Sequence, residues 1–306
     1  MEARTLAQNL LGDPKEKNNI VTRFPSSIIL SIAYGHRVTS DKDRYVLLAD
    51  EVSGAAATAG ALGSSLLDFL PFLQYMPSWF PGTYYANYAR KWAPKVKQFR
   101  DLPFEDVQRQ MKEGTAKPCL LVSELETLGR GPIDGKTTID DIKGASSLAY
   151  IGGVETTTSS LFIFILAMIL HPECQARAQA ELDAVVGSQR LPEFDDRDSL
   201  PYLECLLHET LRWHSPLPTG VPHFTVEDDV YRGMLIPKGS IIVGNARYDE
   251  EKDKPLGLLK ILTNRAMSWD ENIYANPFGF EPTRYLPAPL GRGEPRPVAH
   301  WGFGRR

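Results

Sequence analysis

Apolar residues recur at the spacing of helices over most of the chain. In its first part, this pattern predicts helices at 23–33, 44–67 and 84–100, followed by an amphipathic helix at 104–114. The next stretch, 117–135, is rich in glycine and other turn residues, and predicts a loop. The amino-terminal part of the chain is therefore expected to be helical, with polar joints.

The longest periodic segment predicts a central helix at 138–171. From Ala145 to Leu170 it holds one ionisable residue, Glu155. A helix that is apolar almost all round belongs in the middle of a large helical core. Its last apolar run, 156–172, is shorter than the roughly 20 residues that a spanning helix needs. We therefore expect no transmembrane segment in this chain.

Two further helices are predicted at 172–186 and 199–213. Ser199 can cap the second one, because a hydroxyl accepts from the first free amide groups. Beyond residue 216, the segment 230–244 holds short β-branched runs broken by glycine and proline, which predicts strands and tight turns. The fold class expected is mainly α with a small β component. The buried stripe of the helix 199–213 is expected to consist of Leu203, Leu206, Leu207 and Leu211.

Composition excludes several classes of protein. The 306 residues are 42% hydrophobic and 24% charged, which excludes wholesale disorder and a disulfide miniprotein. The net charge is −4, so no global basic field would recruit nucleic acid, and we expect no such partner. Three cysteines are an odd, sparse set that indicates a reducing compartment.

Two segments could carry chemistry on predicted helices, and each has a plain structural alternative. In GGVETT (152–157) two adjacent glycines let another group approach the backbone, and the next turn offers an acid and an alcohol that could deliver protons. The alternative is close helix packing with a buried glutamate paired elsewhere. Glu209 and Arg212 face the same side of a helix and can pair, although most such pairs are surface ion pairs of little energy.

Two more segments lie in predicted coil. FEPTRY (280–285) places Arg284 between prolines, with a solvated loop as the alternative. WGFGRR (301–306) is a glycine-rich aromatic turn with two cations, with a disordered basic tail as the alternative.

In their order and spacing, these segments resemble the signatures of the cytochrome P450 family, the haem-thiolate monooxygenases, and most of all its fungal microsomal members. GGVETT resembles the oxygen-activation motif on the long central helix of that family. The segment ETLR resembles its Glu-x-x-Arg pair, and Arg284 the loop arginine that joins this pair. WGFGRR resembles the first six positions of the haem-binding loop, with Trp301 where the family usually has Phe. The resemblance covers essentially the whole chain and is strongest from Ile139 onward, which implies a partial cytochrome P450 fold with the central helix against haem.

The resemblance implies the catalytic residues. Glu155 and Thr156 correspond to the acid and alcohol that organise proton delivery. Haem b (iron protoporphyrin IX) would lie beside Gly152 and Gly153, where missing side chains leave room for dioxygen. The activity implied is that of a haem-dependent monooxygenase, which inserts one oxygen atom of O2 into a hydrophobic small molecule.

Further cofactor contacts are implied nearer the carboxyl end. His223 and Arg306 would meet the haem propionates, with an ordinary turn histidine as the alternative for His223. The other implied contacts in the haem-binding loop are those of Trp301 and Gly304.

Glu209, Arg212 and Arg284 are implied to form a structural ion-pair triad beneath the haem. Removing one partner would leave a buried charge unpaired, at a cost of about 3–5 kcal/mol.

The chain departs from the family at the axial ligand. The cysteine thiolate of the family comes two residues after the arginine that Arg306 matches, so no metal ligand is assigned within this chain. Cys119, Cys174 and Cys205 are instead expected to be small buried hydrophobes. The chain as it stands is therefore expected to be inactive, with haem binding in doubt. The alternative function is that of a non-catalytic remnant without haem.

We accordingly expect residues 1–306 to form a single incomplete cytochrome P450 domain, with the anchor and the first β-rich and helical region absent. Residues 248–265 are predicted to be an insertion, on the hypothesis of a retained intron, with a genuine surface loop as the alternative. For a full-length protein the resemblance implies the cytosolic face of the endoplasmic reticulum membrane, held only through the missing amino-terminal anchor. It also implies an NADPH-dependent flavoprotein reductase as electron donor.

Overall fold

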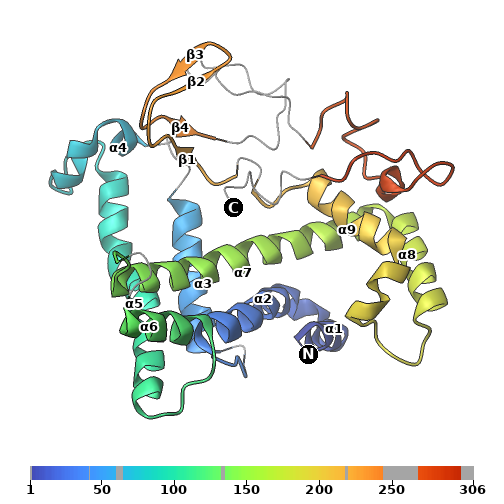
Figure 1. Cartoon of the computed structure of the whole chain (residues 1–306), viewed down its shortest axis with the longest axis horizontal. Coiled ribbons are helices and arrows are strands. Elements are labelled where there is room, and N and C mark those ends of the chain that lie inside the picture. The colour runs from blue at the N-terminus through green and yellow to red at the C-terminus, as the bar shows by residue number, and fades with distance from the viewer. Residues whose placement is uncertain are drawn as a thin grey trace. The chain divides into compact units, whose positions relative to one another are not determined.

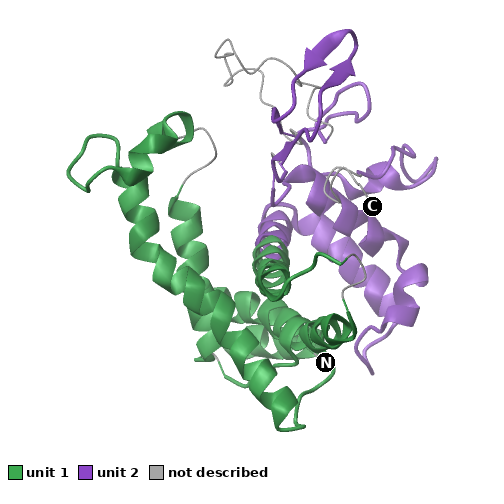
Figure 2. Cartoon of the chain, turned by 60° about the vertical axis from the view of Figure 1, so that its left-hand side comes forward, with its two compact units in different colours: residues 1–158 green, residues 159–306 purple. Residues whose placement is uncertain are grey.

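The computed structural model describes residues 2–40, 42–59, 65–131, 135–217, 220–243 and 268–297. The chain divides into two compact units, Met1–Thr158 and Ser159–Arg306 (Figure 2). Each unit is described by itself. The prediction of one incomplete domain over the whole chain stays a prediction.

The first unit consists of helices joined by short loops (Figure 1). Its core gathers apolar side chains from five of these helices, among them Leu30, Val46, Phe99, Leu121 and Tyr150. The helices are α1 (Glu2–Gly12), α2 (Lys17–Tyr34), α3 (Arg44–Thr58), α4 (Leu66–Phe69), α5 (Tyr84–Lys112), α6 (Leu120–Arg130) and the first part of α7 (Ile139–Leu170), with 3₁₀ turns at Pro14–Glu16 and Pro71–Tyr75.

Several helix boundaries in this unit differ from the predicted ones. The helix predicted at 44–67 ends at Thr58, and the loop predicted at 117–135 contains α6. The two helices predicted at 84–100 and 104–114 are one, α5, although Pro94 and Pro103 lie inside it. Each proline removes a backbone hydrogen bond. Phe99 and Phe104, which precede and follow Pro103 in the chain, are both buried in the core of the first unit, and the burial of this part of the helix offsets the loss.

The second unit combines helices with two small antiparallel sheets, so the predicted fold class, mainly α with a small β component, is confirmed. Strand β2 pairs with β3 through a two-residue turn at Arg232 and Gly233. Both turn residues have positive φ, as this kind of hairpin requires. The elements are the rest of α7, α8 (Pro172–Val185), the 3₁₀ turn η3 (Phe194–Ser199), α9 (Pro201–Trp213), β1 (His223–Phe224), β2 (Asp229–Tyr231), β3 (Met234–Ile236), β4 (Ile241–Ile242) and the 3₁₀ turn η4 (Pro282–Tyr285).

Helix α9 begins and packs differently from the prediction. Ser199 does not cap it, because the carboxylate of Glu181 on α8 accepts from the amides of Tyr202 and Leu203, both at 2.9 Å. The predicted leucine stripe is confirmed for Leu206, which is buried, and for Leu203, which packs against the same core, but it is wrong for Leu207, which is 45% exposed. The side chains that α9 buries are Tyr202, Cys205, Leu206, His208, Glu209, Thr210 and Arg212.

Helix α7 has the predicted extent, but it is not buried all round. Only 17% of its most apolar window is buried, and Leu148 and Ile169 are each 70% exposed. Burial depends on what packs against a helix, which composition does not specify. By length and composition alone, α7 could also cross a membrane, which the shorter run considered in the sequence did not suggest. One such helix is weak evidence, because core helices pass the same test.

Candidate functional site

The two adjacent glycines of α7 have different surroundings. A Cβ atom added to Gly153 would lie 2.8 Å from Cδ1 of Ile29, so α2 packs closely against the backbone there. A Cβ atom added to Gly152 would meet nothing within 4 Å. The close-packing alternative therefore describes Gly153, whereas Gly152 lies on an open side of the helix. Their place beside a haem stays a prediction.

The acid and the alcohol of the same motif follow in the next turn. Glu155 is exposed, which differs from the alternative of a buried, paired glutamate. Thr156 is half-buried, and its hydroxyl donates to the carbonyl oxygen of Gly152 at 2.8 Å. This bond orients the hydroxyl along the helix, toward the turn that holds Gly152.

A second carboxyl group, that of Asp50, interacts electrostatically with Glu155 of this motif. Partial burial, and after it the negative charge of Glu155, raises the pKa of Asp50 on α3. Two carboxyl groups that repel each other hold a proton more tightly than either alone. Sequence reasoning missed Asp50, and no motif marks it, because only the packing of α3 beside α7 brings it near.

The second unit brings together the three residues of the predicted triad. Glu209, Arg212 and Arg284 are between 0 and 1% exposed. Arg212 binds the Glu209 carboxylate through two hydrogen bonds, Nε to Oε2 at 2.8 Å and Nη2 to Oε1 at 2.7 Å. Arg284 adds a bond from Nε to Oε1 at 3.1 Å. These residues therefore form neither a surface ion pair nor a solvated loop.

Other guanidinium nitrogens of the two arginines donate to backbone carbonyls of the coil before η4. Arg212 donates to the carbonyls of Ser268 and Pro277 at 2.7 and 2.6 Å. Arg284 donates to the carbonyl of Ala275 at 2.9 Å. Buried charges are tolerated when their hydrogen-bonding capacity is filled in this way. The two arginines thereby fix the coil that precedes η4 against α9.

Electrostatics agree with this pairing. Burial by itself disfavours the charged form of Arg212, but the bonds with Glu209 outweigh it and raise the pKa of the guanidinium. Burial, and then the charge of Glu209, raises the pKa of Tyr285, whose hydroxyl donates to Glu209 Oε2 at 2.8 Å. The ring of Tyr274 lies 5.3 Å from the Arg212 guanidinium and 5.7 Å from that of Arg284.

Sequence reasoning missed both tyrosines as members of this cluster. Tyr285 directly follows Arg284, so its place in the sequence could have indicated membership of the cluster. Tyr274 lies in no motif, so the sequence gives no such indication for it.

The other predicted contacts are not brought into either cluster. His223 is exposed on β1, opposite Ile242 of β4. Trp301, Gly304 and Arg306 lie outside the described residues, as does the predicted insertion 248–265. Their roles stay predictions.

The described residues fit a haem on one side only. The open face at Gly152 suits a flat apolar group. The cysteines do not suit an iron ligand: Cys174 and Cys205 are buried, and burial raises the pKa of both thiols, which keeps them neutral. Cys119 is half-buried against the core of the first unit. Within the described part of the chain, no group of three or more His, Cys, Asp or Glu could hold a metal ion.

An apolar groove of about 880 Å³ lies beside the GGVETT motif in the first unit. This volume is in the range of small-molecule sites. Ile151, next to Gly152, is one of its walls, and small alanines and three aromatic rings form most of the rest. The apolar lining includes Val52, Ala55, Ala56, Tyr85, Tyr88 and Trp92, and the polar lining residues are Ser65, Asp68, Lys97 and Arg100.

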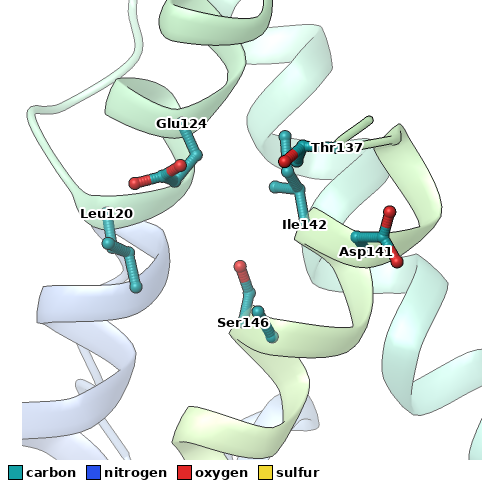
Figure 3. Close-up of a pocket in the computed structure, with 7 residues that line it drawn as sticks. Leu120, Glu124, Thr137, Asp141, Ile142 and Ser146 are labelled. Carbon is teal, nitrogen blue, oxygen red and sulfur yellow. The ribbon is translucent and has the colours of Figure 1, made fainter. Parts of the chain in front are cut away.

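A smaller pocket of about 230 Å³ is lined by α6 and the start of α7. Figure 3 shows Leu120 and Glu124 on one side of it, and Ile142 and Ser146 on the other. Its volume is below the range of most ligand sites. We therefore assign it no function.

Comparisons with known proteins agree with the motifs. The family model for cytochrome P450 matches residues 2–248. The chain is 41% identical over 309 residues to cytochrome P450 monooxygenase 136 of Postia placenta, covering all of this chain and 55% of that protein. It is 36% identical over 305 residues to cytochrome P450 monooxygenase COX2 of Coprinopsis cinerea, covering 99% of this chain and 55% of that protein. The chain thus spans about half the length of the relatives that it matches.

Proposed function

Because this chain belongs to the cytochrome P450 family, we propose that its protein is a haem-dependent monooxygenase acting on a hydrophobic small molecule. The balanced reaction is RH + O2 + 2 electrons + 2 protons → ROH + H2O. The observation that carries the proposal is that the family match spans the GGVETT motif and Glu209–Arg212, and that the described structure buries this pair with Arg284 in one charge cluster.

We propose that the open side of α7 is the haem side. A side chain at Gly152 would occupy the space that a flat ligand needs, and the glycine leaves it free. When bound, haem supplies the activation of dioxygen by two electrons. The cluster around Glu209 holds the chain beneath it, so that its role is structural.

Protons would come from the next turn of α7. Glu155 is exposed and can exchange protons with solvent, and Asp50 is the second carboxyl coupled to it. The Thr156 hydroxyl donates to the carbonyl oxygen of Gly152, four residues earlier on the same face of the helix. We propose that Glu155 and Thr156 pass protons from solvent to the open side of the helix.

The apolar groove beside Ile151 is our candidate for the substrate side. Its alanines and aromatic rings suit a hydrophobic molecule, which agrees with the proposed substrate class. An NADPH-dependent flavoprotein reductase is proposed as electron donor, and the endoplasmic reticulum membrane as location, both by family membership.

One observation favours a second candidate for a polypeptide of these 306 residues. Two of its cysteines are buried, neutral thiols, and the third packs against a core. A polypeptide with only these cysteines is expected to give no thiolate-type absorbance band in its reduced carbon monoxide complex. The second candidate function is therefore that of a non-catalytic remnant without a thiolate-bound haem.

A chimera tests the proposal. The chain replaces the matching part of the Postia placenta relative, and the reduced carbon monoxide spectrum and the oxygenated product are measured with a reductase. We expect the thiolate-type band and reductase-dependent product. A chimera without the band, when the unmodified relative shows it, would establish the remnant.

Matched variants of the chimera test the proton path. Glu155→Gln and Thr156→Ala are expected to lower product formation about a hundredfold, the scale of general acid catalysis, without loss of the band. Glu124→Gln, which changes an exposed acid on α6, is the control and should leave the rate unchanged. Equal rates in all three variants would exclude the proposed path.

A further inference from the structure

The triad around Glu209 is not neutral by itself. One carboxylate faces two guanidinium groups, Arg212 and Arg284, and none of the three side chains is exposed. An excess positive charge in such a site is costly, because burial removes the water that would solvate it. The cluster therefore calls for a second acid.

Glu294 provides that acid. Its Oε2 accepts from Arg284 Nη1 at 2.6 Å, and its side chain is only 8% exposed. Its Oε1 accepts from the amide of Ala275 at 3.1 Å. Two acids and two arginines then balance, and every carboxylate oxygen of the two acids has a donor.

A second ion pair closes the loop that carries Glu294. Arg292 donates from Nε to Glu294 Oε1 at 2.6 Å, and with its other nitrogens to both carboxylate oxygens of Glu281 at 2.9 and 2.6 Å. The backbone is joined too, because the amide of Glu294 donates to the carbonyl of Arg284 at 2.9 Å. Residues 281–294 are thus held by both side chains and backbone.

We propose that Glu294 is a positioning residue, the fourth member of the buried charge cluster, which fixes the chain from η4 to Glu294, ahead of the segment 301–306 in the sequence. The link to that segment rests on the proposed function, in which WGFGRR begins the haem-binding loop. The charge balance itself rests only on the contacts around Glu294. Arg292 supports it from the surface, where its side chain is 40% exposed.

The proposal has a pH signature. Burial disfavours the Glu294 carboxylate, but Arg292 and Arg284 outweigh this and lower its pKa. A group whose pKa is lowered by folding stabilises the fold above its unfolded pKa, and this contribution is lost as the pH falls through the folded pKa. The charged and titratable groups that face this network are Arg284, Arg292, Tyr274, Glu281 and Glu209.

Amide hydrogen exchange of the 306-residue chain tests the proposal without any haem. Glu294→Gln is expected to lower the protection of the amides of Ala275, Glu281 and Arg284 about a hundredfold at pH 7, because it leaves Arg284 in charge excess. Glu271→Gln removes an exposed acid from the same coil and is the matched control, with no change expected. Equal losses in the two variants would overturn the proposal.

Two further variants separate positioning from simple packing. Glu294→Asp keeps the charge, so it should retain more protection than Glu294→Gln at pH 7 and lose it as the pH falls from 5 to 3. The double variant Arg284→Met/Glu294→Gln restores neutrality. If the losses of protection in Arg284→Met and in Glu294→Gln were independent, the double variant would show their product. We expect its loss of protection to be about tenfold smaller than that product. Independent losses, or a Glu294→Asp variant as poor as Glu294→Gln, would overturn the charge balance.

Haem titration of the chimera separates this inference from the proposed function. Loss of protection in Glu294→Gln, together with a chimera that binds no haem, would sustain the charge cluster and reject the monooxygenase. A chimera of Glu294→Gln that binds haem with an unchanged spectrum and an unchanged rate of haem loss would overturn the link to the haem-binding loop.

Discussion

Helices α7 and α9 each carry an acid within a sequence motif, and the two acids have opposite surroundings. Glu155 on α7 is exposed, although the helix around it is apolar. Glu209 on α9 is fully buried, although the helix is amphipathic and carries charges. Composition alone would suggest the reverse, because apolar side chains are the ones most often buried.

The difference shows that partners decide burial. Glu209 is buried because Arg212, Arg284, Tyr285 and the amide of Glu281 all donate to it. A charge with this many donors can leave water without a prohibitive penalty. Around Glu155 the described residues supply packing at Gly153 and a second acid, Asp50, but no such set of donors is recorded there.

The same substitution in the two helices tests this comparison most directly. Glu209→Gln is expected to lower the free energy of unfolding by about 3–5 kcal/mol, since it leaves one buried positive charge, that of Arg212, without its carboxylate. Glu155→Gln should change it by less than about 0.5 kcal/mol, as for other exposed positions. Urea denaturation of both variants measures the two values. Similar losses would mean that Glu155 is buried and paired after all.

Alanine substitutions at two glycines test how tightly the backbone packs around the buried cluster. A Cβ atom at Gly291 would lie 1.9 Å from the carbonyl oxygen of Thr283, so Gly291→Ala should destabilise the chain by about 3 kcal/mol. Gly293 has a φ of +64° and open space, so Gly293→Ala should cost only about 1 kcal/mol. Thermal unfolding compares them, and the reverse order would show that the loop is loosely packed.

The two glycines of α7 give a smaller and opposite contrast. Gly152→Ala is expected to stabilise the chain by up to about 1 kcal/mol, because alanine favours the helix and nothing stands in its way. Gly153→Ala forces Ile29 to move, which offsets that gain and leaves a neutral or unfavourable change. Denaturant midpoints distinguish the two. An equal gain in stability for Gly152→Ala and Gly153→Ala would show that Gly153 is not in close contact with α2.

The smallest expected effect is a pH dependence on α9. Burial, and then the charge of Arg296, lowers the pKa of His208, which lies 3.2 Å from Glu204. The unfolded chain then binds a proton that the folded chain refuses, so stability should fall as the pH drops below about 6.5. His208→Gln should flatten this slope between pH 7 and 5 in urea titrations. An unchanged slope would place its origin in another group.

Local signals predicted much of the fold. Helical periodicity located α7 and α8 almost to the residue, and β-branched runs located the hairpin of β2 and β3. The errors lie where tertiary packing outweighs local preference. Pro103 does not end α5, because this part of the helix is packed in the core through the buried Phe99 and Phe104. Glu181 of α8 caps α9 in place of Ser199, which a local pattern cannot reveal.

The candidate site divides in the same way. Its motif residues were found from their order and spacing, and the structure places Glu209, Arg212 and Arg284 together. Asp50, Tyr274 and Glu294 were not found, since each reaches its cluster from a segment that no motif marks.

By itself, the sequence determined the helical architecture, the family and the residue types that carry its signatures, because these depend on local patterns and their order. Only the tertiary structure decided which acid is buried, which glycine is open, and which second acid balances Arg284. The physical reason is that Coulomb and packing energies depend on distances between segments far apart in the chain. Charge balance in a buried site is therefore a property of the fold.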